Sequence, residues 1–251
     1  MLFFGKLPKF LSPGMAKSAN GIIRLQTFIS LQPMFRTTFA LINKDFAIEL
    51  KRPYQFNGML LYIISTVFVC YQVFGEIIDA NTWNALYWIV LLFAALNSAG
   101  RSFSDEFSSR HLYYYSLSAP AAIIISKMFF NAVLLIALAL LGFLTFTLFL
   151  GMPAASITLF LTAAVFGSIG LALLLTLVAG IAARAGHNFT LMAILSFPIV
   201  LPKLLILINL TRNAMFQASW QEAIKPFFAL FALLVLIVVL ALVLFPYLWK
   251  E

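Results

Sequence analysis

Residues 97–127 read NSAGRSFSDEFSSRHLYYYSLSAPAAIIISK, and they form the main polar interval inside a chain that is otherwise largely apolar. The charged residues and the histidine of this interval are Arg101, Asp105, Glu106, Arg110 and His111. Apolar runs long enough to cross a bilayer flank the interval on both sides. The pattern predicts a loop between two membrane-spanning segments.

The composition of the rest of the chain is that of a membrane protein. Of 251 residues, 63% are hydrophobic and 10% are charged, and several charge-free runs exceed the ~20 residues that a spanning helix needs. The runs show no strict alternation of apolar and polar residues, which excludes the strands of a membrane barrel. We therefore predict an all-α polytopic membrane protein.

Six apolar runs qualify as spanning helices. They cover Pro53 to Gly75, Ala80 to Gly100, Pro120 to Leu150, Ala154 to Ala183, Asn188 to Leu210 and Pro226 to Trp249. The short connection between the first two makes them an antiparallel hairpin, and Gly151 with Pro153 separates the third from the fourth. In the fifth, Pro198 and Pro202 each remove a backbone donor, so this helix should be kinked or broken midway.

The N-terminal part divides into an extension and a helix. Residues 1–33 are rich in glycine, proline, serine and lysine, and we expect a poorly ordered cytoplasmic extension before one six-helix domain over residues 34–251. The alternative is that translation starts at Met34. From Met34 to Arg52 the apolar residues share one narrow helical face, which predicts an amphipathic helix in the membrane interface. An ordinary cytoplasmic helix packed on the protein's own loops is the alternative.

The distribution of basic residues predicts the orientation. The formal net charge is +8, but the lysines and arginines cluster at the ends of apolar runs, so no nucleic-acid partner is needed to explain it. With both termini in the cytoplasm, only Lys203, Arg212 and Lys225 of the 16 basic residues fall within or beyond the membrane. The central polar interval is then cytoplasmic.

No catalytic, metal or cofactor site is predicted. The chain has no Gly-x-x-x-x-Gly-Lys-Ser/Thr motif for binding ATP, and its one cysteine, Cys70, lies inside an apolar run as a packing residue. The two histidines, His111 and His187, lack spaced partner ligands. None of the six runs holds an acidic residue, which argues against an ion-coupled transporter. We expect a chain that is not itself an enzyme.

Two sets of residues are candidates for other roles. In the fourth run, small residues recur every four positions: Ala164, Ser168, Ala172, Thr176 and Gly180. We interpret them as positions of close helix packing rather than as residues of a transport site. In the central interval, acidic, basic and aromatic residues form a docking surface for a soluble partner; they are Arg101, Asp105, Glu106, Arg110, Tyr113 and Tyr114. For any single residue of the interval, a solvated surface charge is the alternative.

Motifs in this order resemble the CcmB family, the membrane subunit of the ABC transporter of cytochrome c maturation. After a basic amphipathic helix and a hairpin come Asp105-Glu106, Leu117-Ser118-Ala119-Pro120 and Ser126-Lys127, and later a Gly180 to Gly186 segment and a run with Pro198 and Pro202. The chain departs from the family pattern at Ser109 to Tyr113, where a second acid is missing, and at Lys203, where an apolar residue is usual.

The resemblance implies an ABC-2 type permease in the bacterial inner membrane. Its partners would be a CcmA-like ATP-binding subunit, a CcmC-like haem-handling protein, a CcmE-like haem chaperone and, in a homodimer, a second copy. ATP would be bound by the partner subunit, and haem would be cargo rather than a resident cofactor. The alternatives are an ABC-2 permease for a lipid, polysaccharide or drug, and a non-transporting membrane scaffold. An intramembrane enzyme is the least favoured class because no catalytic constellation occurs in the spans.

Overall fold

The computed structural model describes residues 36–51, 53–75, 78–104, 120–152, 155–184, 189–216 and 220–248. Within these ranges every regular element is a helix. The predicted N-terminal extension, residues 1–33, and most of the central polar interval lie outside the described residues.

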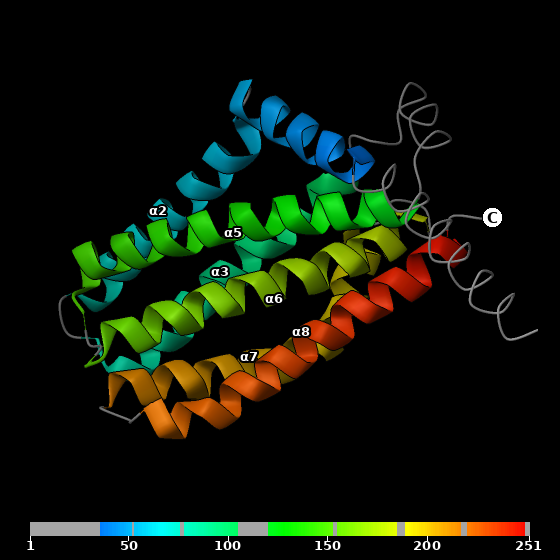
Figure 1. Ribbon diagram of the computed structural model, residues 1–251. Coiled ribbons are helices and arrows are strands. Elements are labelled where there is room, and N and C mark those ends of the chain that lie inside the picture. The colour runs from blue at the N-terminus through cyan, green and yellow to red at the C-terminus, as the bar shows by residue number, and fades with distance from the viewer. Residues whose placement is uncertain are drawn as a thin grey trace, which may run out of the picture.

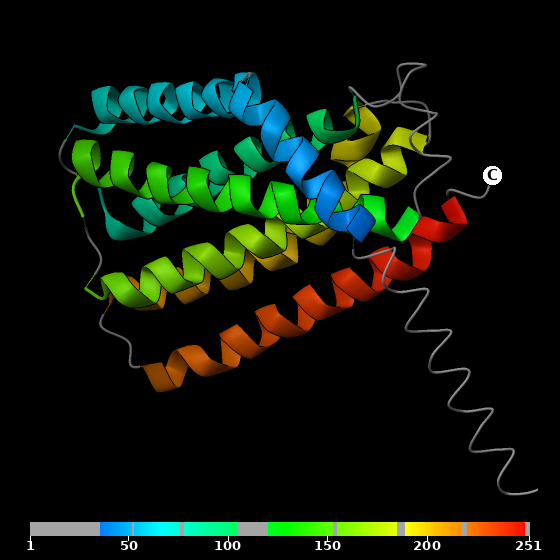
Figure 2. The ribbon, with the colours of Figure 1, turned by 45° about the horizontal axis from the view of Figure 1, so that its top comes forward.

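Six long helices form the bundle (Figure 1). They are α2 (Tyr54–Phe74), α3 (Ala80–Ser104), α5 (Pro120–Leu150), α6 (Ile157–Arg184), α7 (Phe189–Met215) and α8 (Trp220–Leu248). Each is long and apolar enough to cross a membrane. A further helix over residues 36–51 precedes them and lies across the bundle rather than along it (Figure 2). The predicted all-α, six-span architecture is confirmed.

The polar interval between the fifth and sixth spans is shorter than the sequence predicts. We expected Thr211 to Lys225 to connect the helices, but α7 continues to Met215 and α8 begins at Trp220. Tertiary packing explains the difference, because Thr211, Ala214 and Ala223 are fully buried in the interior. The polarity of the local sequence did not predict the helix ends here, because these side chains face the interior of the bundle.

The two prolines of α7 do not interrupt it. The helix runs without a break through Pro198 and Pro202, although a proline removes one backbone hydrogen bond at each position. Of the two predicted outcomes, a kink or a break, the break is wrong and the kink stays a prediction. Both prolines are exposed on the outer face of α7, whereas Val200 and Lys203 are buried on its inner face.

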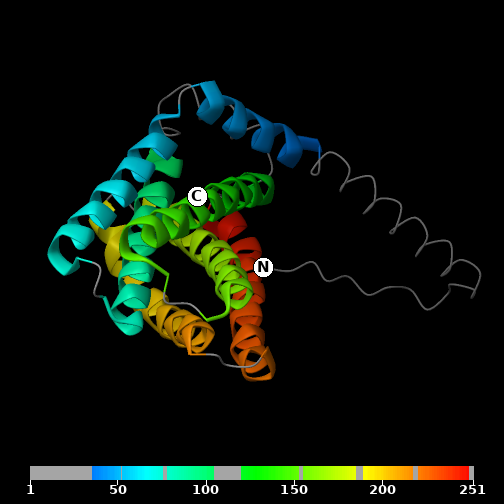
Figure 3. The same ribbon diagram turned by 90° about the vertical axis from the view of Figure 1, so that its left-hand side faces the viewer.

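Helix α6 is the centre of the bundle. In an apolar stretch of 18 consecutive residues, 78% of the α6 residues are buried, against 17% for α8. Helix α6 contacts α3, α5, α7 and α8 (Figure 3). The small residues at intervals of four are all buried in it: Ala164, Ser168, Ala172, Thr176 and Gly180. A Cβ at Gly180 would lie 2.9 Å from the Phe245 ring of α8 and 3.4 Å from the Phe103 ring of α3. Absence of side-chain bulk therefore lets neighbouring helices approach α6 closely.

Aromatic side chains of α3 fill the half of the core nearest the α5–α6 connection. Trp83, Tyr87 and Trp88 are at most 1% exposed. The Trp83 and Tyr87 rings contact those of Phe146 in α5 and Phe160 in α6, and the Trp88 ring meets Tyr87 edge to face. Their polar atoms all find acceptors: Trp83 Nε1 donates to the Gly151 carbonyl, Tyr87 Oη to the Ala139 carbonyl and Trp88 Nε1 to Thr211 Oγ1. Buried Trp and Tyr need such partners, above all in hydrocarbon.

Local signals set two helix ends at this side of the bundle. Asp79 caps α3 by accepting hydrogen bonds from the backbone N–H and hydroxyl of Thr82, and these bonds lower the pKa of the exposed Asp79 carboxyl. Helix α5 ends before Gly151, whose φ of 74° lies in the left-handed region that favours glycine. The predicted end of the third span at Gly151 is confirmed.

Gly167 offers a test of the close packing around α6. A Cβ at this position would lie 2.4 Å from Trp88 Cη2 and 2.8 Å from Leu207 Cδ2, and Trp88 cannot yield easily because its indole is hydrogen-bonded. We expect Gly167→Ala to lower the free energy of unfolding by about 1–3 kcal/mol through overpacking. Thermal unfolding of the purified chain in detergent measures this.

Gly58→Ala is the matched control. Gly58 is exposed in α2 and nothing lies within 4 Å of its Cβ position, so its replacement should be neutral or slightly stabilising. Equal thermal stability of the two variants would contradict the packing described for α6.

Candidate functional site at the α3/α5 end

The candidate docking segment joins α3 to α5, and the structure describes both of its flanks. We call the end of the bundle that holds the last turn of α3 and the first turn of α5 the α3/α5 end. Arg101 lies exposed in the last turn of α3. The other candidate docking residues lie outside the described residues: Asp105, Glu106, Arg110, Tyr113 and Tyr114.

Asn131 of α5 joins the two flanks of this segment to the central helix. Its Oδ1 accepts hydrogen bonds from Ser102 Oγ at 2.8 Å and Ser98 Oγ at 3.2 Å, both from α3. Its Nδ2 donates to Thr176 Oγ1 of α6 at 2.9 Å. All four side chains are at most 8% exposed. We call Ser98, Ser102, Asn131 and Thr176 the Asn131 cluster; it holds α3, α5 and α6 together beneath the docking segment.

A buried ion pair attaches the 36–51 helix to α5. Lys127 Nζ lies 3.2 Å from Asp45 Oδ2 and 3.3 Å from Asp45 Oδ1, and both residues are 8% exposed. One turn away the Phe46 and Phe130 rings meet edge to face, with centroids 5.2 Å apart. Figure 2 shows this helix lying across the start of α5. A lysine near the start of a spanning helix commonly extends its ammonium group toward the lipid headgroups, but Lys127 is buried against Asp45.

Helix α2 is joined to the same end. The Phe56 backbone N–H in its first turn donates to Glu49 Oε1 at 2.8 Å, across the corner with the 36–51 helix. Gln55 Nε2 donates to the Ser98 carbonyl at 3.1 Å and to Ser98 Oγ at 3.2 Å. The α3/α5 end is therefore a continuous set of polar contacts that runs from the 36–51 helix to α6.

A second polar cluster ties α3 to α7 in the other half of the bundle. Asn84 Nδ2 donates to the Ile208 carbonyl at 2.8 Å, and Thr211 Oγ1 lies 2.7 Å from Asn84 Oδ1 and 2.9 Å from Trp88 Nε1. Neither cluster was predicted, because the charged residues of the spans do not point to it. An asparagine inside an apolar run, as at positions 84 and 131, was the available signal, since a buried amide must find partners.

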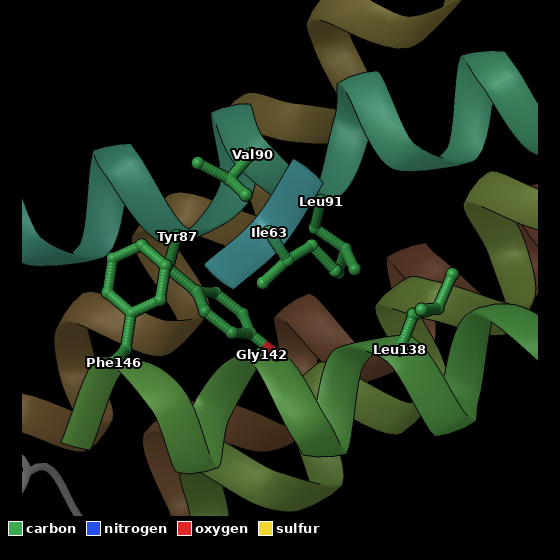
Figure 4. Close-up of a pocket in the computed structure, with 7 residues that line it drawn as sticks. All are labelled: Ile63, Tyr87, Val90, Leu91, Leu138, Gly142 and Phe146. Carbon is green, nitrogen blue, oxygen red and sulfur yellow. The ribbon is translucent and has the colours of Figure 1, made fainter. Parts of the chain in front are cut away.

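The described residues contain no group of side chains that could hold a metal ion. No three of their histidine, cysteine, aspartate and glutamate side chains lie together as ligands. A cavity of about 10 Å³ lies between α2, α3 and α5, lined by apolar residues that include Ile63, Leu91 and Leu138 (Figure 4). It is too small and apolar to hold even one water molecule well.

The Asp45–Lys127 pair can be tested by removing one or both charges. We expect Lys127→Met to lower the free energy of unfolding by about 1–3 kcal/mol. The variant removes the buried cation and leaves the Asp45 carboxylate only the half-exposed Lys44, whose Nζ lies 3.6 Å from Asp45 Oδ1. The double variant Asp45→Leu with Lys127→Met should recover most of that stability, since no buried charge remains. Thermal unfolding in detergent measures both.

Lys51→Met is the control for this experiment, since Lys51 is exposed on the same helix. Its stability should match that of the wild-type chain. If Lys127→Met were as stable as this control, the ion pair would not hold the 36–51 helix in place.

The comparisons with known proteins agree with this architecture. The family described as CcmB protein matches residues 36–249, from the first described helix to beyond the last described residue of α8. No curated protein and no solved structure matches the sequence. The family match covers most of the chain, and with the six apolar helices it indicates a multi-pass inner-membrane permease subunit of an ABC transporter in cytochrome c biogenesis. The chain belongs to the CcmB family.

Proposed function

We propose that this chain couples ATP hydrolysis by a separate CcmA-like subunit to the export of haem or to the release of a haem-loaded chaperone. Both termini and the segment between α3 and α5 face the cytoplasm, as the distribution of basic residues favours. Arg101, Asp105, Glu106, Arg110, Tyr113 and Tyr114 contact the ATP-binding subunit. ATP is bound by that partner.

The Asn131 cluster is the observation that carries this proposal. It connects both flanks of the docking segment to each other and to the central helix through hydrogen bonds of 2.8 to 3.2 Å. When the ATP-binding subunit displaces the docking segment, α3 and α5 therefore move together, and α6 moves with them through Thr176. Because buried polar contacts and close-packed helices do not deform gradually, the displacement passes across the membrane as rigid-body movement.

The 36–51 helix takes part in the same movement. Its buried ion pair with Lys127 lies in the second turn of α5, and Glu49 and Gln55 link its end to α2 and α3. A helix in the membrane interface that is fixed to α5 resists sinking into or leaving the headgroup region. The 36–51 helix thereby holds the start of α5 in place while the ATP-binding subunit changes conformation.

Haem is the cargo of the assembly in this proposal, and the chain's role toward it is mechanical. A CcmC-like protein presents the haem and a CcmE-like chaperone receives it. His111 and His187, the two histidines of the chain, lie outside the described residues, and no ligand role is assigned to them. Because an ABC transporter needs two membrane halves and this chain has six spans, we propose that two copies act together.

The docking assignment is tested by co-purification with the CcmA-like subunit. We expect the wild-type chain to retain an active ATPase in mild detergent, and Asp105→Lys with Glu106→Lys to lose most of it, because like charges at a protein interface oppose association. Glu222→Lys is the control, since Glu222 is exposed at the opposite end of the bundle. Unchanged co-purification of the double variant would remove this docking assignment, and failure of the wild-type chain to bind any ATPase would favour a scaffold.

The transmission step is tested separately at Asn131. We expect Asn131→Leu to keep the ATPase bound but to lower chaperone release per ATP hydrolysed, because α3 and α6 lose their shared partner. The loss of hydrogen bonds should lower stability by only about 1–3 kcal/mol, since Ser102 and Thr176 also bond to backbone carbonyls.

Asn97→Leu is the matched control for Asn131. Asn97 is exposed on α3, and its amide donates to the Phe93 carbonyl of its own helix. Chaperone release that fell equally in both variants would show that the Asn131 cluster has no special part in coupling.

A further inference from the structure

Lys203 lies at the centre of the membrane-spanning part of the bundle. It follows Phe189 by fourteen positions in α7 and precedes Met215 by twelve, so it lies about 18 to 21 Å along the helix from either end. Its four-carbon stem is too short to carry the ammonium group to the headgroups from this depth. Ionisable residues at such positions are rare and commonly mark a binding site or a transport pathway.

The ammonium group of Lys203 has no acceptor among the described residues. The side chain is 2% exposed, and Nζ makes no hydrogen bond in that part of the chain. Lys203 points at Gly170 in the middle of α6, where Nζ occupies the space of a side chain, 2.0 Å from the position of a Cβ. Glycine at 170 therefore creates the space that Lys203 fills.

The chain itself cannot supply a counter-ion at this depth. Its eight acidic residues all lie at helix ends or outside the spans: Asp45, Glu49, Glu76, Asp79, Asp105, Glu106, Glu222 and Glu251. A second copy of the same chain has the same distribution, so dimerisation does not provide one either. An unpaired ammonium in hydrocarbon costs several kcal/mol, and this cost favours an anion from elsewhere.

We infer that Lys203 is the anion-binding residue of a membrane-embedded site between α6 and α7, which takes the carboxylate of an apolar, membrane-soluble molecule. The ligand must be largely apolar because the α7 side chains next to Lys203 are apolar. They are Val200, Leu204 and Leu207, and all three are buried. A lipid phosphate stays at the headgroups, far from Lys203, whereas a carboxylate on an apolar body can reach it.

Helix α7 is continuous at this level but lacks two of its backbone hydrogen bonds there. Pro198 and Pro202 have no backbone N–H, so the carbonyls of Ile194 and Pro198 lack their usual helical donors one turn later. Helices weakened in this way near the midplane of a membrane commonly form the binding sites of transporters. Both prolines face outward, so bending there would part α7 from α6 at Lys203.

Two apolar molecules that carry carboxylates serve as probes, and they represent two different sources of the ligand. Oleate represents the carboxylates of the lipid phase, and haem, which carries two carboxylates on an apolar ring, represents the cargo. For haem the inference rests on the proposed function; for oleate it does not.

The experiment compares Lys203→Met with the wild-type full chain in detergent. We expect Lys203→Met, which keeps the shape but removes the charge, to bind radiolabelled oleate or haem about 10- to 100-fold more weakly, the usual effect of losing a charged hydrogen bond. Oleyl alcohol and haem dimethyl ester, which lack the carboxylate charge, should not distinguish the two proteins. Without ligand, Lys203→Met should unfold at the same or a higher temperature, because it buries no unpaired charge.

Ser196→Ala is the matched control on the same buried face of α7. Ser196 Oγ donates to the Met192 carbonyl of its own helix, so this variant should bind like the wild-type chain. Loss of haem binding alone would identify the cargo as the source, and loss of oleate binding alone would identify the lipid phase.

The inference is overturned if the carboxylates bind both proteins equally, or if the wild-type chain prefers neither carboxylate to its uncharged analogue. The test uses the isolated chain, so either result leaves the ATPase partnership untouched. Conversely, failure to bind an ATPase would not alter the oleate result.

Discussion

Hydrocarbon offers no hydrogen-bond partners, and this constraint organises the interior of the bundle. Each buried polar side chain that joins two helices here does so because its alternatives in the membrane are worse. Asn131 has acceptor and donor atoms on one amide, so it can bind α3 and α6 at once. Asn84 of α3 uses both atoms of its amide toward α7, through Ile208 and Thr211. Two amides thus join α3 to α5 and α7, and α5 to α6.

The same constraint explains why α6 is central and poor in large side chains. A helix surrounded by four others can be approached closely only where its residues are small, as at Gly167, Gly170 and Gly180. Close approach brings Thr176 within hydrogen-bond distance of Asn131. It also lets Lys203 lie against α6. Packing and polar contacts therefore depend on one another. Because the helices are closely packed, a movement of α3 or α5 is passed on to α6 rather than absorbed by rearrangement of side chains.

Much of the fold could be predicted because apolar length and charge distribution are local properties. The six spans, the helix before them and the turn at Gly151 follow from composition and from glycine chemistry within a few residues. The small-residue positions of α6 were recognisable by their spacing. The extent of α7 and α8 was not, because Thr211 and Ala223 are helical through contacts with distant residues. The docking role of Arg101 and of the residues after it remains a prediction from sequence.

By itself, the sequence determined that this chain crosses the membrane six times and that its six apolar runs contain no acid. A spanning helix must satisfy its own backbone, and the length and charge of each run can be read directly from the sequence. The sequence also carried enough ordered motifs to indicate the CcmB family. Only the tertiary structure decided which polar residues meet. Asp45 and Lys127 are 82 positions apart, and nothing local to either residue indicates the other. The unpaired state of Lys203 likewise depends on what α6 places opposite it, which is the backbone of a glycine.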